Sequence, residues 1–201
     1  AERAPERASE PGGSGGRPVR VLVFGGSQGA HAINEAMAAA APRLAAGGVP
    51  VSVVHQTGER DLESVRDAYR QNGLDARVEP FFFDMDQQMA AADLAVCRAG
   101  ATTLAELAVA QLPAVLVPLP TATDDHQRWN AMALVNQRAA VLLEQRDLTG
   151  ERLAGEILAM AGDASRREQM RARLAACARP DAARLIVDRG LALAGVAGEA
   201  A

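Results

Sequence analysis

The chain has 201 residues, of which 49% are hydrophobic and 23% charged, a composition typical of a globular domain with a buried core. Its formal net charge of -4 argues against nucleic-acid binding, which usually needs a basic surface. No apolar run approaches the ~20 residues of a membrane span, and the first residues show no apolar signal segment. Cys97 and Cys177 match no metal or redox spacing, so we expect two reduced thiols in a cytoplasmic protein.

The chain alternates between short apolar runs and helical patterns from Val19 onward. Residues 1–17 are rich in Ala, Glu, Arg, Pro, Gly and Ser, which predicts a flexible linker before a folded domain over residues 18–201. The expected strands and helices, in chain order, are Val19–Phe24, helix Ala30–Ala46, Val51–Val54, helix Asp61–Asn72, Ala76–Phe81, helix Asp86–Ala91, Leu94–Cys97, helix Leu104–Ala110, Val115–Val117, helix Gln127–Gln137 and Ala140–Leu143. A helical tail with a break at Pro180 follows over Leu148–Ala194. This alternation predicts an α/β fold with a Rossmann-like doubly wound parallel sheet and a helical carboxyl-terminal tail.

Ligands of such sheets bind beyond the carboxyl ends of the strands, and the first loop there is Gly25–Ala30, GGSQGA. Its glycines allow a tight turn and a close approach of the backbone, and the following helix offers free N–H groups to a diphosphate. Ser27 adds a hydroxyl donor. The alternative is a tight turn that binds nothing. Neither the G-x-G-x-x-G spacing nor a P-loop Lys is present, which argues against NAD and ATP.

A second glycine-containing loop, Arg98–Gly100, leads into the helix that carries Glu106. Thr103 is a candidate N-cap, and with Glu106 it completes a T-x-x-E capping box, which is a purely structural explanation of the carboxylate. Alternatively, Glu106 accepts hydrogen bonds from a ribose diol.

The third loop contains a dense polar cluster after the fifth strand. Gln127 and Asn130 offer amide groups suited to sugar hydroxyls, whereas Trp129 is expected to pack in the core. His126 has no second ligand at metal-like spacing, so we expect no metal site.

In the fourth loop, three consecutive phenylalanines at residues 81–83 cannot all point inward from a strand. At least one is expected to reach the loop face, where it could line a base pocket.

Five segments together resemble the MurG family of glycosyltransferases, which transfer N-acetylglucosamine (GlcNAc) from UDP-GlcNAc to lipid I and produce lipid II for peptidoglycan. They are GGSQGA at Gly25–Ala30, HQTG at His55–Gly58, F-x-x-D-M at Phe81–Met85, CRAGATTLAEL at Cys97–Leu107 and PLPTATDDHQRWNA at Pro118–Ala131. The resemblance implies the carboxyl-terminal, donor-binding half of the two-domain GT-B architecture. It also implies an inverting hexosyl transfer that needs no cofactor.

The resemblance assigns substrate-binding roles along these segments. Ser27, with Gln28 and Gly29 beside it, is expected at the diphosphate, and the backbone of Phe82 at the uracil. The phosphates and ribose are expected to be surrounded by Ala101, Thr102, Thr103, Leu104, Ala105 and Glu106, with Glu106 on the ribose hydroxyls. The GlcNAc hydroxyls are expected at Gln127 and Asn130.

The family's amino-terminal half, which holds the lipid acceptor, faces the membrane and carries the proposed catalytic His, has no counterpart in this sequence. We therefore expect no catalytic residue here and no transfer by this chain alone. The full-length protein is expected at the inner face of the cell membrane, with lipid I bound by the other half. Two alternatives remain, namely the donor-binding subunit of a split two-chain transferase and a non-catalytic UDP-sugar-binding module.

Overall fold

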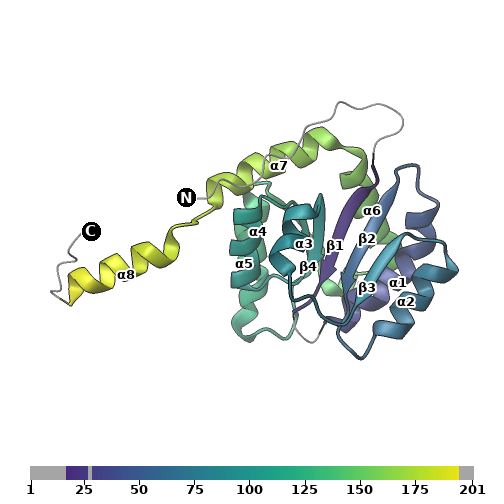
Figure 1. Ribbon diagram of the computed structural model, residues 1–201, viewed down its shortest axis with the longest axis horizontal. Coiled ribbons are helices and arrows are strands. Elements are labelled where there is room, and N and C mark those ends of the chain that lie inside the picture. Colours follow the sequence, from purple (N-terminus) through teal and green to yellow (C-terminus); the bar gives the residue numbers. More distant parts are fainter. Residues whose placement is uncertain (1–16, 27–28, 195–201) are drawn as a thin grey trace.

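A six-stranded parallel sheet forms the centre of the molecule (Figure 1). The computed structural model describes residues 17–26 and 29–194. The sheet order is β3-β2-β1-β4-β5-β6, and the strands are β1 Val19–Phe24, β2 Val51–Gln56, β3 Ala76–Glu79, β4 Leu94–Cys97, β5 Ala114–Leu116 and β6 Ala140–Leu142. The predicted doubly wound fold is confirmed.

Helices cover both faces of the sheet because alternate strand residues point to opposite sides. Val21 and Val23 of β1 belong to one hydrophobic core, with α1 (His31–Ala45), α2 (Leu62–Gln71) and α6 (Gly150–Gly162). Leu22 and Phe24 belong to a second core on the other face. The helices that contribute to it are α3 (Met85–Ala91), α4 (Ala101–Ala110), α5 (His126–Asn136) and α7 (Ala164–Cys177).

The strand order reverses beside β1, and this reversal positions the site. The chain moves outward from β1 to β2 and β3, then returns to place β4 on the other side of β1. The loop after β1 and the loop after β4 therefore diverge, one leading to α1 and the other to α4 on the opposite face. A crevice at the carboxyl ends of these two strands is the usual ligand position in such sheets.

The amino ends of the strands are closed by an ion-pair cluster around Asp93. Arg17 donates two hydrogen bonds of 2.7 and 2.8 Å to its carboxylate, and the backbone N–H of Arg20 donates a third. Arg171 of α7 lies 3.5 Å away. Burial opposes the charge of Asp93, but these partners outweigh it and lower its pKa. Arg17, the last residue of the expected linker, is thus bonded to the folded body, and residues 1–16 lie outside the described residues.

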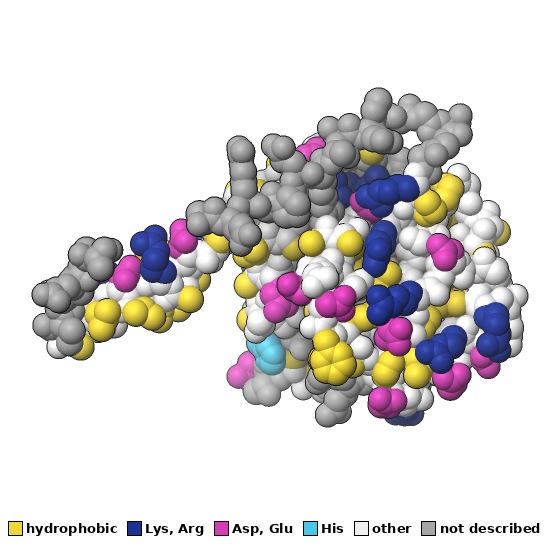
Figure 2. Space-filling model, in the orientation of Figure 1, with side chains coloured by type: hydrophobic (Ala, Val, Ile, Leu, Met, Phe, Trp, Pro, Cys, Tyr) yellow, Lys and Arg dark blue, Asp and Glu magenta, His cyan; other side chains and the backbone are white. Residues whose placement is uncertain are grey.

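The last helix, α8 (Ala182–Leu193), extends away from the body (Figure 1). None of its residues is buried. Hydrophobic side chains gather along one side of it and charged ones along the other (Figure 2). The exposed apolar residues are Leu185, Ile186, Val187, Leu191 and Leu193. The described part of the chain contains no helix that is both long and apolar enough to cross a membrane.

Candidate functional site

Two cavities are lined in part by the first turn of α4. The first, the glycine cavity, has a volume of about 580 Å³ and is lined by Gly25, Gly26, Gly29, Ala30, His31, Ala32, Arg98, Gly100, Thr103, Leu119, Gln127 and Gln145. The second, the α3–α4 groove, has a volume of about 450 Å³ and is lined by Met85, Asp86, Met89, Ala90, Thr102, Ala105, Glu106, Val109 and Ala110. Thr102 lines the groove and its neighbour Thr103 lines the glycine cavity. The two cavities therefore lie next to the same first turn of one helix, which contributes one threonine to each.

The glycine loop after β1 requires glycine for steric reasons. Gly26 and Gly29 have φ angles of +96° and +74°, which L side chains rarely adopt. A Cβ at Gly29 would overlap the carbonyl oxygen of Thr57, and one at Gly25 would overlap Ala30. The loop therefore brings bare backbone to the cavity wall, next to the N–H groups at the start of α1. Ser27 and Gln28, expected at the diphosphate, lie outside the described residues.

The helix α4 begins three residues earlier than expected, and the capping-box interpretation is wrong. Its N-cap is Gly100, whose carbonyl accepts a hydrogen bond of 3.0 Å from the N–H of Leu104. Thr103 is the third helical residue, which places Glu106 in the second turn. The extended conformation of Gly100 starts the helix without a side-chain cap. The carboxylate of Glu106 is thus not used for capping.

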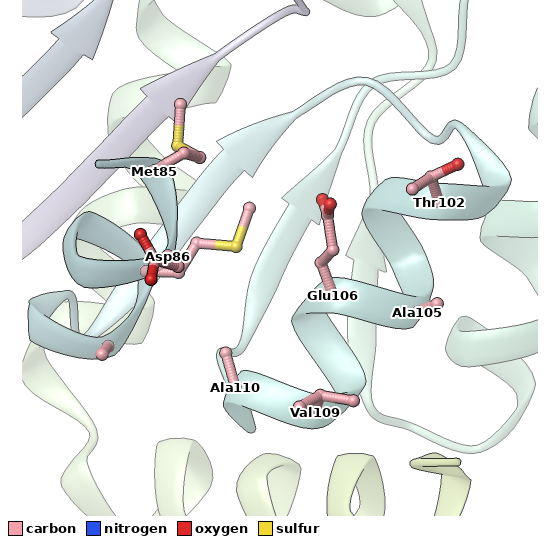
Figure 3. A pocket seen from close by; sticks show the side chains of 9 residues that line it. Met85, Asp86, Thr102, Ala105, Glu106, Val109 and Ala110 are labelled. Atoms are coloured by element: carbon pink, nitrogen blue, oxygen red, sulfur yellow. The ribbon is translucent and has the colours of Figure 1, made fainter. Parts of the chain in front are cut away.

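Glu106 is exposed at the α3–α4 groove and forms no hydrogen bond or ion pair within the described part of the chain. In Figure 3 its side chain rises from α4 on the same side as Thr102, and Met85 and Asp86 lie on α3 across the groove. The rest of the lining is mostly apolar, since Met89, Val109 and three alanines contribute to it. A flat apolar ring with a neighbouring diol fits this combination of an apolar wall and a free carboxylate.

Gln127 lines the glycine cavity and holds two of its loops together. Its Oε1 accepts hydrogen bonds from the backbone N–H groups of Ala99 (3.3 Å) and Leu119 (3.0 Å), which joins the loops after β4 and β5. Its Nε2 is left to donate toward a ligand. Asn130 donates from Nδ2 to the Ala99 carbonyl, 3.2 Å away, which leaves its oxygen and one amide hydrogen for other partners, and it is not among the residues that line the cavity. Trp129 is 64% exposed rather than packed in the core, which corrects that expectation.

The three phenylalanines divide as expected, with Phe81 and Phe83 exposed and Phe82 only 3% exposed. The backbone N–H of Phe82 donates to Oε1 of Gln56, 2.9 Å away. This leaves the Phe82 carbonyl as the backbone group that can meet a base. Gln56, to which the sequence assigned no role, also donates from Nε2 to the carbonyl of Gly26. Its place as the second residue of the HQTG segment was the only sign in the sequence that it belongs to the site.

A polar network runs from the core to His31 at the cavity wall. Tyr69 donates to Nδ1 of His55 (2.7 Å), and Nε2–H of His55 donates to Oδ1 of Asn34 (3.0 Å). The Asn34 amide donates to Asp61 (2.8 Å), whose two oxygens also lie 2.9 and 3.0 Å from Nδ1 of His31. Burial lowers the pKa of His55 to about 3, so this ring is neutral. Burial also opposes the charge of Asp61, but the hydrogen bonds of Asn34 and His31 lower its pKa.

Arg98 supplies a half-buried positive charge to the glycine cavity. Its Nη1 donates to the carbonyls of Val117 (3.1 Å) and Pro118 (3.2 Å), which anchors the guanidinium. Burial lowers its pKa, yet an arginine stays protonated at neutral pH. The cavity thus combines a cation, two helix amino ends and an amide donor, which favours a phosphate-bearing ligand. Within residues 17–26 and 29–194, no cluster of three or more His, Cys, Asp or Glu is arranged to hold a metal ion.

The chain is similar to bacterial sugar transferases over most of its length. Two curated relatives, from Pelobacter propionicus and Anaeromyxobacter sp., are 51% and 52% identical over 86% and 84% of this chain. Both carry the name UDP-N-acetylglucosamine--N-acetylmuramyl-(pentapeptide) pyrophosphoryl-undecaprenol N-acetylglucosamine transferase. The chain covers 46% and 44% of these relatives, so it spans about half of their length.

A solved structure and a family profile agree with these relatives. The crystal structure of Acinetobacter baumannii MurG superposes with a TM-score of 0.79 at 35% identity, covering 86% of this chain and 49% of that one. The calicheamicin glycosyltransferase CalG4 shares the fold, with a TM-score of 0.59 at 19% identity. The profile of the glycosyltransferase family 28 C-terminal domain matches residues 20–186. The chain therefore belongs to glycosyltransferase family 28, as a C-terminal domain of that family.

Proposed function

We propose that this chain is the UDP-GlcNAc-binding half of an inverting transferase that adds GlcNAc to lipid I and so makes lipid II. One observation carries the proposal: the first turn of α4 lines both the glycine cavity and the α3–α4 groove, with Thr103 at the former and Thr102 at the latter. A nucleoside diphosphate sugar has three parts, and this arrangement offers a place for each.

The nucleoside belongs in the α3–α4 groove. There Glu106 accepts hydrogen bonds from the ribose hydroxyls. The carbonyl of Phe82, in the loop that leads to Met85 at the edge of the groove, accepts one from the uracil N–H. The diphosphate lies between the amino ends of α1 and α4, near the guanidinium of Arg98. Ser27, Gln28 and Gly29 belong to the same part of the site. The sugar occupies the glycine cavity, with the free amide N–H groups of Gln127 directed to its hydroxyls.

The chemical role of these residues is to stabilise the leaving group. In an inverting transfer, the acceptor hydroxyl oxygen bonds to the anomeric carbon while the bond from that carbon to the diphosphate oxygen breaks. Negative charge then grows on UDP. Fixed N–H dipoles at both helix amino ends and the Arg98 cation stabilise that charge without rearranging. The proton of the acceptor hydroxyl goes to a base that we assign to the other half of the full-length protein.

The acceptor side of the reaction also belongs to that other half. The relatives are about twice as long as this chain, and their name specifies a pyrophosphoryl-undecaprenol acceptor. We propose that the full-length protein binds this lipid at the cytoplasmic face of the membrane. This half alone then binds the donor but transfers nothing.

Calorimetric titration of the chain with UDP-GlcNAc, UDP-glucose and UDP-GalNAc tests the proposal. We expect UDP-GlcNAc to bind most tightly, and no binding of any of the three, or equal binding of all, would contradict the assignment. Transfer to lipid I on addition of the amino-terminal half of a curated relative would separate the transferase from a non-catalytic UDP-sugar-binding module. Co-purification of a separately encoded partner would favour the split two-chain transferase.

A further inference from the structure

One amide oxygen beside the glycine cavity has no hydrogen-bond partner among the described residues. Gln145 lines this cavity from the loop after β6, which the sequence did not single out. Its Oε1 is buried and accepts no hydrogen bond within the described part of the chain. Buried polar atoms are normally paired, and an unpaired one destabilises the fold. Such an atom, on a side chain that lines a cavity, fits a hydrogen bond that a ligand completes.

The position of Gln145 is fixed by its surroundings. It opens a short 3-10 turn, Gln145–Asp147, in which its own carbonyl accepts a hydrogen bond from the N–H of Leu148 (3.1 Å). The preceding residue, Glu144, accepts a hydrogen bond of 2.8 Å from Arg128 of α5. The same helix carries Gln127, so the two glutamines are held on one frame at the same cavity.

The chemistry of an acceptor identifies the part of the ligand that it meets. A phosphate at neutral pH offers oxygens and no protons to donate, so a buried amide oxygen gains nothing from facing it. The nucleoside belongs in the α3–α4 groove, whose lining does not include Gln145. Hydroxyl and acetamido N–H groups of the sugar are the remaining donors of a nucleotide sugar.

We propose that Gln145 is a specificity-determining residue, whose Oε1 accepts a hydrogen bond from the sugar of the bound nucleotide sugar. The inference rests on the proposed function and adds a residue to it. Gln127 donates to the sugar and Gln145 accepts from it, so the two amides together recognise both the acceptor and the donor atoms of its polar groups. A ligand that lacks the sugar leaves Gln145 unpaired.

The substitution Gln145→Met tests this, because it keeps the length of the side chain and removes its polar end. Gln71→Met, at an exposed position on α2, is the matched control. UDP-GlcNAc and UDP are each titrated against the unaltered chain and both variants, and the melting temperature of each protein is measured. We expect UDP-GlcNAc to bind Gln145→Met about 5- to 20-fold more weakly, as for one lost hydrogen bond in a closed site. UDP should bind it as before, and its melting temperature should stay equal or rise.

Unchanged UDP-GlcNAc binding to Gln145→Met would overturn the inference, and so would an equal loss for UDP and UDP-GlcNAc. If methionine does not fit and the variant unfolds, Gln145→Ala gives the same comparison with a smaller side chain. Failure of the unaltered chain to bind UDP would contradict the proposed function itself. If the unaltered chain and the Gln145→Met variant bind both ligands with equal affinity, only the role of Gln145 is contradicted.

Discussion

Oε1 of Gln56 accepts a hydrogen bond of 2.9 Å from the backbone N–H of Phe82, and both residues are buried. The other end of the same amide donates to the carbonyl of Gly26, also at 2.9 Å. One side chain at the end of β2 therefore joins the loop after β1 to the loop after β3. These loops belong to the diphosphate and base parts of the proposed site, so Gln56 sets their separation.

Replacing Gln56 by Leu should weaken both the fold and nucleotide binding. The change leaves the buried Phe82 N–H unpaired, which costs about 1–3 kcal/mol. It also removes one of two hydrogen bonds to the Gly26 carbonyl, which keeps the one from the N–H of Gly29. Urea unfolding and UDP titration measure the two effects. Gln87→Leu, at an exposed position on α3, is the control. A less stable variant with an unchanged Kd for UDP would show that the link between the loops does not matter for binding.

Replacing Glu106 by Ala should weaken UDP binding without lowering the melting temperature. The structure places this carboxylate in the second turn of α4, exposed and without a capping role, so the helix does not depend on it. Loss of a charged acceptor for two ribose hydroxyls corresponds to about 10- to 100-fold in Kd. Glu106→Gln, which keeps one acceptor oxygen, should lie between the two proteins. A large drop in melting temperature with unchanged UDP binding would instead assign Glu106 to the fold.

Buried His55 should make the fold sensitive to mild acid. Its pKa is lowered from 6.5 to about 3 by burial, so the folded protein keeps it neutral while the unfolded chain takes up a proton below pH 6.5. The free energy of unfolding should therefore fall as the pH drops from 6.5 toward 3, by up to about 1.4 kcal/mol per pH unit. Urea unfolding between pH 6.5 and 5 measures this, before most unfolded-state carboxylates titrate. His55→Phe should be less stable at pH 7 but show a flatter slope, and an equal slope would exclude His55 as the cause.

Replacing Gly29 by Ala should disrupt the loop at the cavity wall. The φ angle of +74° strains any L residue by about 1–2 kcal/mol, and the added Cβ would also overlap the Thr57 carbonyl. We expect a lower melting temperature and little UDP binding. Gly48→Ala is the control, because nothing lies within 4 Å of its Cβ position and its φ is ordinary. Retained UDP affinity in Gly29→Ala would show that the loop can shift at little cost.

The sequence was sufficient to predict a strand or helix wherever a local residue pattern determines it. The strand Leu94–Cys97 was predicted to the residue, because its apolar run is bounded by polar residues. Thr103 and Glu106 suggested a helix start that the backbone of Gly100 in fact provides three residues earlier. The strand expected over Ala76–Phe81 ends at Glu79, just before Pro80, which has no N–H for the ladder.

The roles of Gln56 and Gln145 could not be predicted from the residues next to them in the sequence. Gln56 bonds to groups 26 and 30 residues away, so its role depends on how distant loops meet. Gln145 follows the last strand, and it is informative only because its side chain lines a cavity formed with other loops and its oxygen is buried without a partner among the described residues. Among the site residues from the sequence, Gln127, Thr103 and Gly29 meet in one cavity, and Glu106 and Thr102 in the other. Their roles in binding remain predictions.

Helix α8 is expected to be much less stable than the rest of the domain. A 12-residue helix with no buried residue gains little from the rest of the domain, and helices of that length are marginal in water by themselves. Its amide protons should therefore exchange with solvent far faster than those of β1 or β4, whose exchange requires opening of the sheet. Heating should melt α8 gradually before the sheet unfolds cooperatively, so the chain contains two units of very different stability.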